Sequence, residues 1–319
     1  MDYDRVIDEF ICCPYDHSKL TVTWTIPNSE GQLFCPACKR TWKIGDGILC
    51  VMPDYYNSPE PAGNDDVTKE CLAEISARDA QARVYEKMFS SRKNVIELQT
   101  TLRELNPESG DVVAELGAGT GRTLTYSERC KLVIACDYSL ESLRELRNKD
   151  LKHVIPVQAD ATQLPLTDGC LKKVLAVGLL QHIPSQRARR QHLKECHRIL
   201  VGNGEVLMSG IYNFNLVERM RDVKMVYTKD DIHGGADGKM GYHTNNTIYY
   251  YNFDIRELIT EVNLYFEVLD AFGFYVKLPF LGKVLEEFLG PYRSDCLWQR
   301  TRIGNWFGQL LLIRMKKVA

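Results

Sequence analysis

The stretch Val112-Val113-Ala114-Glu115-Leu116-Gly117-Ala118-Gly119-Thr120-Gly121-Arg122 decides the fold of this chain. A short apolar run of β type reaches an acidic residue, and three glycines at alternate positions follow. Glycine allows a tight turn after a strand, and it lets a ligand lie against the backbone because no Cβ intervenes. The stretch therefore predicts a strand followed by a ligand-binding turn.

The spacing of the glycines excludes one class of dinucleotide site. A nicotinamide-binding turn requires a third small residue in the pattern G-x-G-x-x-G, and Arg122 stands at that position. Glu115 also places a negative charge beside the loop. That charge suits a cationic ligand better than a pyrophosphate.

The chain around this turn alternates strands and helices as a doubly wound α/β fold does. Asp137 ends the second predicted strand, where a carboxylate can accept hydrogen bonds from both hydroxyls of a ribose. Ser139 is predicted to cap a helix that runs through Asn148. The first strand and six others predict a seven-stranded sheet, the six lying over 132–136, 154–158, 174–177, 205–209, 266–274 and 309–316.

This ordered series of motifs resembles that of the class I S-adenosylmethionine (SAM) methyltransferases. The E-L-G-x-G-x-G run at 115–121 is similar to motif I of that family, and Asp160-Ala161 and His182 follow at matching places. The resemblance implies a Rossmann-like sheet, SAM as cofactor, and methyl transfer as the reaction. It also implies a ribose contact at the second strand, an adenine face at Tyr138 and an adenine edge at Asp160. The cofactor contacts implied in this way are Glu115, Gly117, Ala118, Gly119, Asp137, Tyr138, Asp160, Ala161 and Gly178.

A helix predicted over 67–89 precedes the glycine loop. The resemblance suggests that this helix lies over the cofactor as a lid. Arg78 and Tyr85 could then reach the methionine carboxylate of SAM as a cation and a hydroxyl donor. A solvated arginine and a core tyrosine are the alternative, and the sequence leaves both open.

The first 53 residues have the pattern of a small β-rich module. Cys35-Pro36-Ala37-Cys38 gives half of a tetrahedral metal site, and Cys13 is the natural third ligand. Asp16 stands where a fourth cysteine is expected, so the choice between Asp16 and His17 as fourth ligand stays open. The module resembles the zinc-ribbon-like domain that activates, or is fused to, some methyltransferases, including rRNA guanine-N1 methyltransferases. We expect a structural zinc site from Cys13, His17, Cys35 and Cys38, a linker over 54–66 and the methyltransferase domain over 67–319.

Candidate catalytic residues lie after the fourth and fifth strands. His182 ends the loop after strand four, where the resemblance places a histidine near the transferred methyl group. His243 is a second candidate base, and Tyr242 would orient the acceptor. Both lie in an insertion over 211–252, and a second insertion covers 275–308.

The acceptor is the least determined feature. Aromatic residues and histidines gather in the two insertions, which favours a pocket for a small-molecule acceptor, for example an aromatic or natural-product compound. An RNA base in tRNA or rRNA is the alternative, because heads of this type occur in RNA-modifying enzymes. Basic residues on the helix predicted over 187–200 fit a solvated helix face better than a nucleic-acid face; they are Arg187, Arg189, Arg190 and Lys194.

Composition supports a cytoplasmic, globular enzyme. The 319 residues are 45% hydrophobic and carry a net charge of −2, which calls for neither nucleic acid nor an anionic membrane. No apolar run reaches the ~18 residues that a membrane-spanning helix needs. Eleven cysteines with an acidic N-terminus predict reduced thiols. The oligomeric state stays open.

Overall fold

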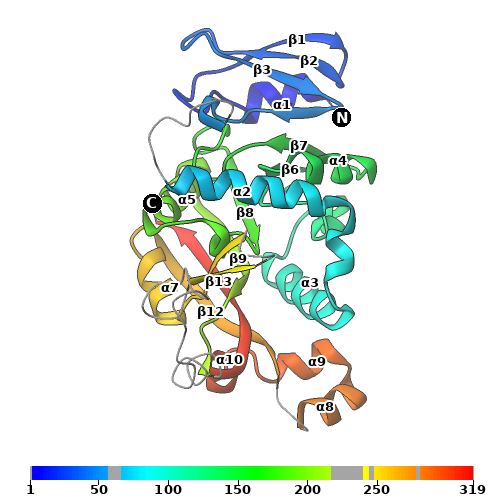
Figure 1. The fold of residues 1–319 in the computed structure, drawn as a ribbon, viewed down its shortest axis with the longest axis vertical. Helices are drawn as coiled ribbons and strands as arrows, with labels where there is room; N and C mark the ends of the chain where they lie inside the picture. Colours follow the sequence, from blue (N-terminus) through cyan, green and yellow to red (C-terminus); the bar gives the residue numbers. More distant parts are fainter. Residues whose placement is uncertain (1, 57–65, 217–239, 244–247, 278–280, 319) are drawn as a thin grey trace.

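The computed structural model describes residues 2–56, 66–216, 240–243, 248–277 and 281–318. Its main feature is a mixed sheet whose strands run in the order β1-β2-β3-β4-β7-β6-β5-β8-β9-β13-β12. Figure 1 shows this sheet passing from the N-terminal strands at the top to β12 and β13 below. The strands are β1 Thr21–Ile26, β2 Glu30–Phe34, β3 Thr41–Gly45, β4 Ile48–Cys50, β5 Val112–Leu116, β6 Leu132–Asp137, β7 Val154–Gln158, β8 Leu171–Val177, β9 Leu200–Tyr212, β12 Phe266–Val276 and β13 Gly308–Lys317.

The seven strands from β7 to β12 form the predicted α/β sheet. β5 to β9 pair in parallel, whereas β13 pairs antiparallel with both β9 and β12. The apolar runs of β5 and β6 are buried because helices cover both faces of a parallel sheet. The seven-stranded Rossmann-like prediction is confirmed, with one difference in length: β9 begins at Leu200, before the Gly-Asn-Gly turn that the sequence placed ahead of strand five.

The N-terminal strands extend this sheet instead of forming a separate one. β1 to β4 pair antiparallel in chain order, and β4 then pairs in parallel with β7 through Leu49↔Val157 and Cys50↔Gln158. A helix that the sequence did not predict, α1 Tyr3–Phe10, covers this part and buries Ile7 and Phe10. The head, which we define as residues 2–53, therefore shares both a sheet and a hydrophobic core with the rest of the chain.

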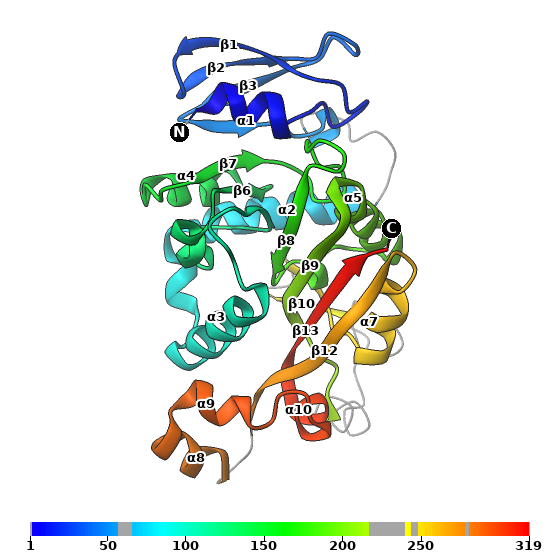
Figure 2. The same ribbon diagram turned by 180° about the vertical axis from the view of Figure 1, so that it is seen from behind.

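The helices lie on both faces of the sheet, as Figures 1 and 2 show. The helix predicted over 67–89 ends as an α-helix at Gln81, and a tighter helical segment continues to Met88. Ser139 caps the helix that ends at Asn148, as predicted. The bounds are α2 Asp66–Gln81, η2 Ala82–Met88, α3 Ser91–Leu105, η3 Leu124–Arg129, α4 Leu140–Asn148, η4 Leu180–His182, α5 Gln186–Ile199 and α7 Ile255–Val262, with a short segment η1 Asp54–Tyr56 after the head.

The two predicted insertions are only partly within the described residues. Of the first, a hairpin of β10 Met240–His243 and β11 Ile248–Tyr251 is described, whereas 217–239 and 244–247 lie outside. The second contains α8 Leu281–Leu289, α9 Pro291–Cys296 and α10 Arg302–Phe307. The predicted linker likewise lies outside the described residues over 57–65. Among the described helices, none has the length and apolar character needed to cross a membrane.

Candidate functional site

The glycine loop turns sharply at the carboxyl end of β5. The backbone amides of Gly117 and Ala118 both donate to the carbonyl of Cys136 on β6, at 2.8 and 3.0 Å. Gly119 has a φ of +54°, and a Cβ there would meet no atom within 4 Å. Open space beside a backbone amide is what a closely bound ligand requires.

Asp137 lies at the end of β6 and faces this loop. Its carboxylate accepts the Gly119 amide on one oxygen and the Ser139 amide on the other, each at 2.8 Å. A carboxylate has about four lone-pair sites, so each oxygen keeps one for a hydroxyl. Burial raises the pKa of Asp137, while the two backbone amides counter that effect. The geometry fits the two hydroxyls of a ribose, as the sequence predicted.

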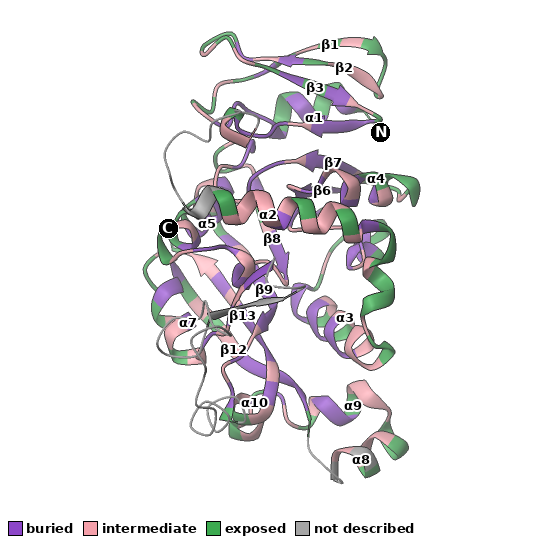
Figure 3. Cartoon of the chain, viewed as in Figure 1, coloured by how far each residue is buried: buried purple, intermediate pink, exposed green. Residues whose placement is uncertain are grey.

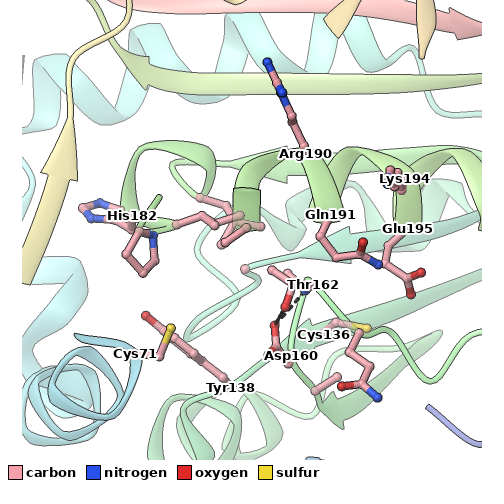
Figure 4. A pocket seen from close by; sticks show the side chains of 18 of the residues that line it. Cys71, Cys136, Tyr138, Asp160, Thr162, His182, Arg190, Gln191, Lys194 and Glu195 are labelled. Atoms are coloured by element: carbon pink, nitrogen blue, oxygen red, sulfur yellow. Dashed lines mark hydrogen bonds between the residues drawn. The ribbon is translucent and has the colours of Figure 1, made fainter. Parts of the chain in front are cut away.

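Two adjoining cavities open at this edge of the sheet, and both are lined by Gly117, Asp137 and His182. The larger has a volume of about 1070 Å³ and extends to α5 and the head. Figure 4 shows Tyr138 and Asp160 in a close view of a pocket together with residues of α5. The predicted cofactor residues that line one cavity or both are Arg78, Tyr85, Gly117, Gly119, Asp137, Tyr138, Asp160, Ala161 and Gly178.

Glu115 and Ala118 line neither cavity. Glu115 is fully buried, and its carboxylate accepts hydrogen bonds from the hydroxyls of Thr123 and Tyr126. Burial raises the pKa of Glu115 to about 7. The prediction that Glu115 presents a charge beside the ligand is therefore corrected. Its side chain is hydrogen-bonded to Thr123 and Tyr126, in the segment that follows the loop.

Asp160 has more partners than the sequence suggested. One of its oxygens accepts the amide and hydroxyl of Thr162, and the other accepts the hydroxyls of Tyr55 and Tyr56 at 2.6 and 2.9 Å. These four donors fill the lone pairs of a carboxylate. An adenine amine could bind Asp160 only after one tyrosine hydroxyl turned away. The two tyrosines come from η1, and no motif in the sequence pointed to them.

His182 lies in η4, between the glycine loop and the β10–β11 hairpin. Its Nδ1 is 2.8 Å from the carbonyl oxygen of Tyr249 on β11. A carbonyl can only accept, so Nδ1 carries the proton and the neutral ring has its lone pair on Nε2. This is the tautomer that a general base needs.

Glu74 on α2 is a site residue that the sequence analysis missed. It is 3% exposed, its Oε1 lies 3.6 Å from His182 Nδ1, and it accepts a hydrogen bond from Arg78 at 3.1 Å. Burial raises the pKa of Glu74 to about 7, although Arg78 opposes this effect. An acid one helical turn before Arg78 was the available signal. Arg78 thus lines the smaller cavity and forms an ion pair with the buried Glu74, and its contact with the methionine carboxylate of SAM stays a prediction.

The other two candidate catalytic residues, Tyr242 and His243, lie on β10. Tyr242 pairs with Tyr249, and His243 pairs with Ile248. Tyr249 on β11 accepts a hydrogen bond from His182. The β10–β11 hairpin of the first insertion therefore lies next to His182. The structure describes the backbone of β10 only, so their catalytic roles remain predictions.

The predicted metal ligands of the head come together with one change. Cys13, Asp16, Cys35 and Cys38 place their ligand atoms within 4.8 Å of one another. The Sγ atoms of Cys13 and Cys38 are 3.6 Å apart, close to the roughly 3.8 Å between ligands of a tetrahedral zinc ion with Zn–S bonds of about 2.3 Å. His17 is corrected to Asp16, since the His17 ring lies 3.6 Å from Asp168 instead. Three sulfurs and one carboxylate oxygen are ligands that Zn²⁺ accepts.

Comparison with known proteins agrees with this geometry. A sequence family described as a methyltransferase domain matches residues 114–208. The probable tRNA methyltransferase 9B of Homo sapiens is 27% identical over 107 residues, which cover 34% of this chain and 22% of that protein. The Mus musculus tRNA (carboxymethyluridine(34)-5-O)-methyltransferase ALKBH8 is 24% identical over 121 residues, which cover 38% of this chain and 17% of that protein. The matched part thus spans about a fifth of the length of these relatives.

Solved structures share the fold. A chain of the complex between the Haloferax volcanii Trm112 methyltransferase activator and a methyltransferase superposes with a TM-score of 0.51 at 16% identity, covering 76% of this chain and 98% of that chain. The 1,6-didemethyltoxoflavin-N1-methyltransferase of Burkholderia thailandensis gives a TM-score of 0.52 at 16% identity, covering 82% and 95%. These likenesses show the shared fold. The family match over residues 114–208 shows that the chain carries a class I SAM-dependent methyltransferase domain.

Proposed function

We propose that this chain transfers a methyl group from SAM to a nucleotide of tRNA. The observation that carries the proposal is that the curated relatives, which match 34% and 38% of this chain, include a probable tRNA methyltransferase of human and a tRNA methyltransferase of mouse. The small-molecule acceptor expected from the aromatic insertions has less support. The neighbour that binds 1,6-didemethyltoxoflavin shares 16% identity, which speaks to the fold alone.

The residues of the site have separable tasks in this reaction. Bound SAM supplies an activated methyl group on a sulfonium, so the protein has mainly to align the acceptor and exclude water. Asp137 would bind the ribose. Arg78, whose side chain is oriented by its hydrogen bond to Glu74, would bind the methionine carboxylate. His182 Nε2 would take the proton that an oxygen or nitrogen acceptor releases as the new bond to carbon forms.

The test is transfer of isotopically labelled methyl groups from SAM to two acceptor pools, bulk tRNA and a low-molecular-weight cell extract. We expect label in the tRNA, and nuclease digestion with mass spectrometry then identifies the nucleoside. Asp137→Ala is the cofactor control and should weaken SAM binding by about 1–3 kcal/mol. Label in the small-molecule pool alone would contradict the proposal, while calorimetric SAM binding would still support the methyltransferase domain.

We also propose that the head holds one zinc ion through Cys13, Asp16, Cys35 and Cys38. The proposal rests on the clustering of these four ligand atoms and on the donor chemistry. Ser18 supports the site, because its hydroxyl lies 3.0 Å from the sulfur of Cys35. Elemental analysis should find about one zinc per chain.

A further inference from the structure

The exposed side of α5 carries three positively charged side chains. Arg187, Arg190 and Lys194 are exposed, and their spacing of three and four residues places them along one side of the helix. None of the three forms a hydrogen bond or ion pair with another described residue. We call these three residues the α5 cation row.

Other arginines of the same helix have structural partners. Arg189, which the sequence placed on a solvated face, is buried, with its guanidinium 4.5 Å from the ring centroid of Tyr251. Arg198 donates to the carbonyls of Leu164 and Leu166 and to the carboxylate of Asp168. Glu261 is buried, and its Oε2 lies 3.8 Å from Arg189 Nε. Glu261 also interacts electrostatically with Arg190. Apart from this electrostatic interaction of Arg190, the cation row takes no part in the charge pairs described for this region.

The row borders the larger cavity, which leads inward to the site. In Figure 4, Gln191 and Glu195 point from α5 toward Asp160, whereas Arg190 extends from the other side of the helix. The cavity that these cations line also contains the cofactor residues Asp137, Tyr138 and Asp160. The volume of about 1070 Å³ lies at the upper end of the ~300–1,000 Å³ typical of ligand pockets and includes the residues assigned to the adenosine of SAM. An RNA strand whose phosphates run along α5 would match this arrangement. The adenosine of SAM takes Asp137, Tyr138 and Asp160, and the part of the cavity lined by His182 is left for an unpaired base, as RNA recognition commonly requires.

We propose that Arg187, Arg190 and Lys194 bind backbone phosphates of the unpaired RNA segment that carries the target nucleotide. This inference rests on the proposed tRNA acceptor. Because the net charge of the whole chain is −2, general attraction does not supply the binding, and the row must act locally. Each phosphate held in a single strand contributes about −0.7 to the slope of log K against log salt concentration.

The test compares a triple variant, Arg187→Gln with Arg190→Gln and Lys194→Gln, with the wild-type protein. The probe is fluorescently labelled bulk tRNA, and its anisotropy is followed between about 50 and 200 mM salt. Removing three contacts should flatten the slope by about 2 and weaken binding by up to about 100-fold at 0.1 M salt. The matched control is Lys131→Gln with Lys152→Gln and Lys172→Gln, three exposed lysines near the amino ends of β6, β7 and β8. SAM binding by calorimetry should be unchanged in both variants, which also shows that they fold.

The outcomes separate this surface from the proposed acceptor. A flattened slope in the α5 variant, with a wild-type slope in the control, supports the assignment. If the slope is unchanged in the α5 variant, or falls equally in the control, the α5 cation row does not bind RNA. The proposed RNA acceptor is not affected by that result. Wild-type protein that binds SAM but not tRNA overturns the acceptor and the surface together. Binding of adenosine monophosphate as tight as that of tRNA would overturn a polymeric partner and point to a small anionic substrate.

Discussion

Glu115, in the stretch 112–122 that decides the fold, was correctly predicted to be important, but its predicted role was wrong. The sequence places an acid at the end of a strand, next to three glycines, but it does not show which way the side chain points. In the structure the carboxyl group is completely buried under the loop with two hydroxyl donors. Burial disfavours its charged form, which is why its pKa rises to about 7.

The pH dependence of stability should report this burial. The folded carboxyl binds a proton below about pH 7, whereas the unfolded one does so only below about 4.5. Between these values the native state holds the extra proton, so the contribution of Glu115 to stability falls as pH rises. Glu115→Gln should be more stable relative to wild type at pH 8 than at pH 5, measured by urea unfolding. The exposed Glu267→Gln is the control, and a pH-independent difference for Glu115→Gln would show that the group is charged throughout.

His182 is the residue on which turnover should depend most. His182→Ala should lower turnover by about 10²–10⁴-fold if Nε2 is the general base, yet keep SAM affinity within a few-fold. The measurement is initial rate on the acceptor that the labelling experiment identifies, with calorimetry for SAM. His153→Asn, at an exposed left-handed position in the loop before β7, serves as control. Equal rates in the two variants would mean that alignment alone carries the reaction.

At the scale of elements, the sequence predicted the helices and strands whose bounds are set by a local residue pattern. β7 has the predicted bounds and β6 is one residue longer, because apolar runs bounded by Asp or Gln define buried parallel strands. The helix boundary at Gln81 and the start of β9 at Leu200 were missed. No proline or glycine marks the first, and pairing with β8 extends the second through a turn-like Gly-Asn-Gly. Tyr55 and Tyr56 reach Asp160 across about a hundred residues, a contact that no local pattern encodes.

The segment η1 gives a prediction of its own. If its hydroxyls compete with the adenine amine for Asp160, Tyr56→Phe should free one acceptor and bind SAM more tightly. A typical hydrogen bond is worth about 0.5–1.5 kcal/mol, so the gain should be at most about tenfold by calorimetry. Tyr265→Phe lines the same cavity without bonding Asp160 and should bind SAM as wild type does. Weaker binding by Tyr56→Phe would mean that the hydroxyl contacts the cofactor directly.

The whole molecule has a core that runs through the head. One buried cluster contains Phe10, Leu33 and Leu49 of the head together with Ile155 of β7 and Ala114 of β5. Figure 3 shows buried residues both in the head and along the central strands. The sequence suggested two units because a stretch with Pro59, Pro61 and Gly63 follows the head and was predicted to be a linker. Only the β4–β7 pairing, a long-range contact, shows that they share a sheet.

If the head holds zinc as proposed, removing the metal should affect more than the head. Metal binding contributes free energy to folding, and the head continues into the sheet beside the cofactor edge. We expect chelation of zinc from the wild-type protein to lower the melting temperature in one cooperative calorimetric transition, and to weaken SAM binding as η1 loosens. Cys38→Ser should do the same more mildly, whereas Cys296→Ser, in the second insertion, should not. Two separate transitions with unchanged SAM affinity would show instead that the head melts alone, despite the shared strands.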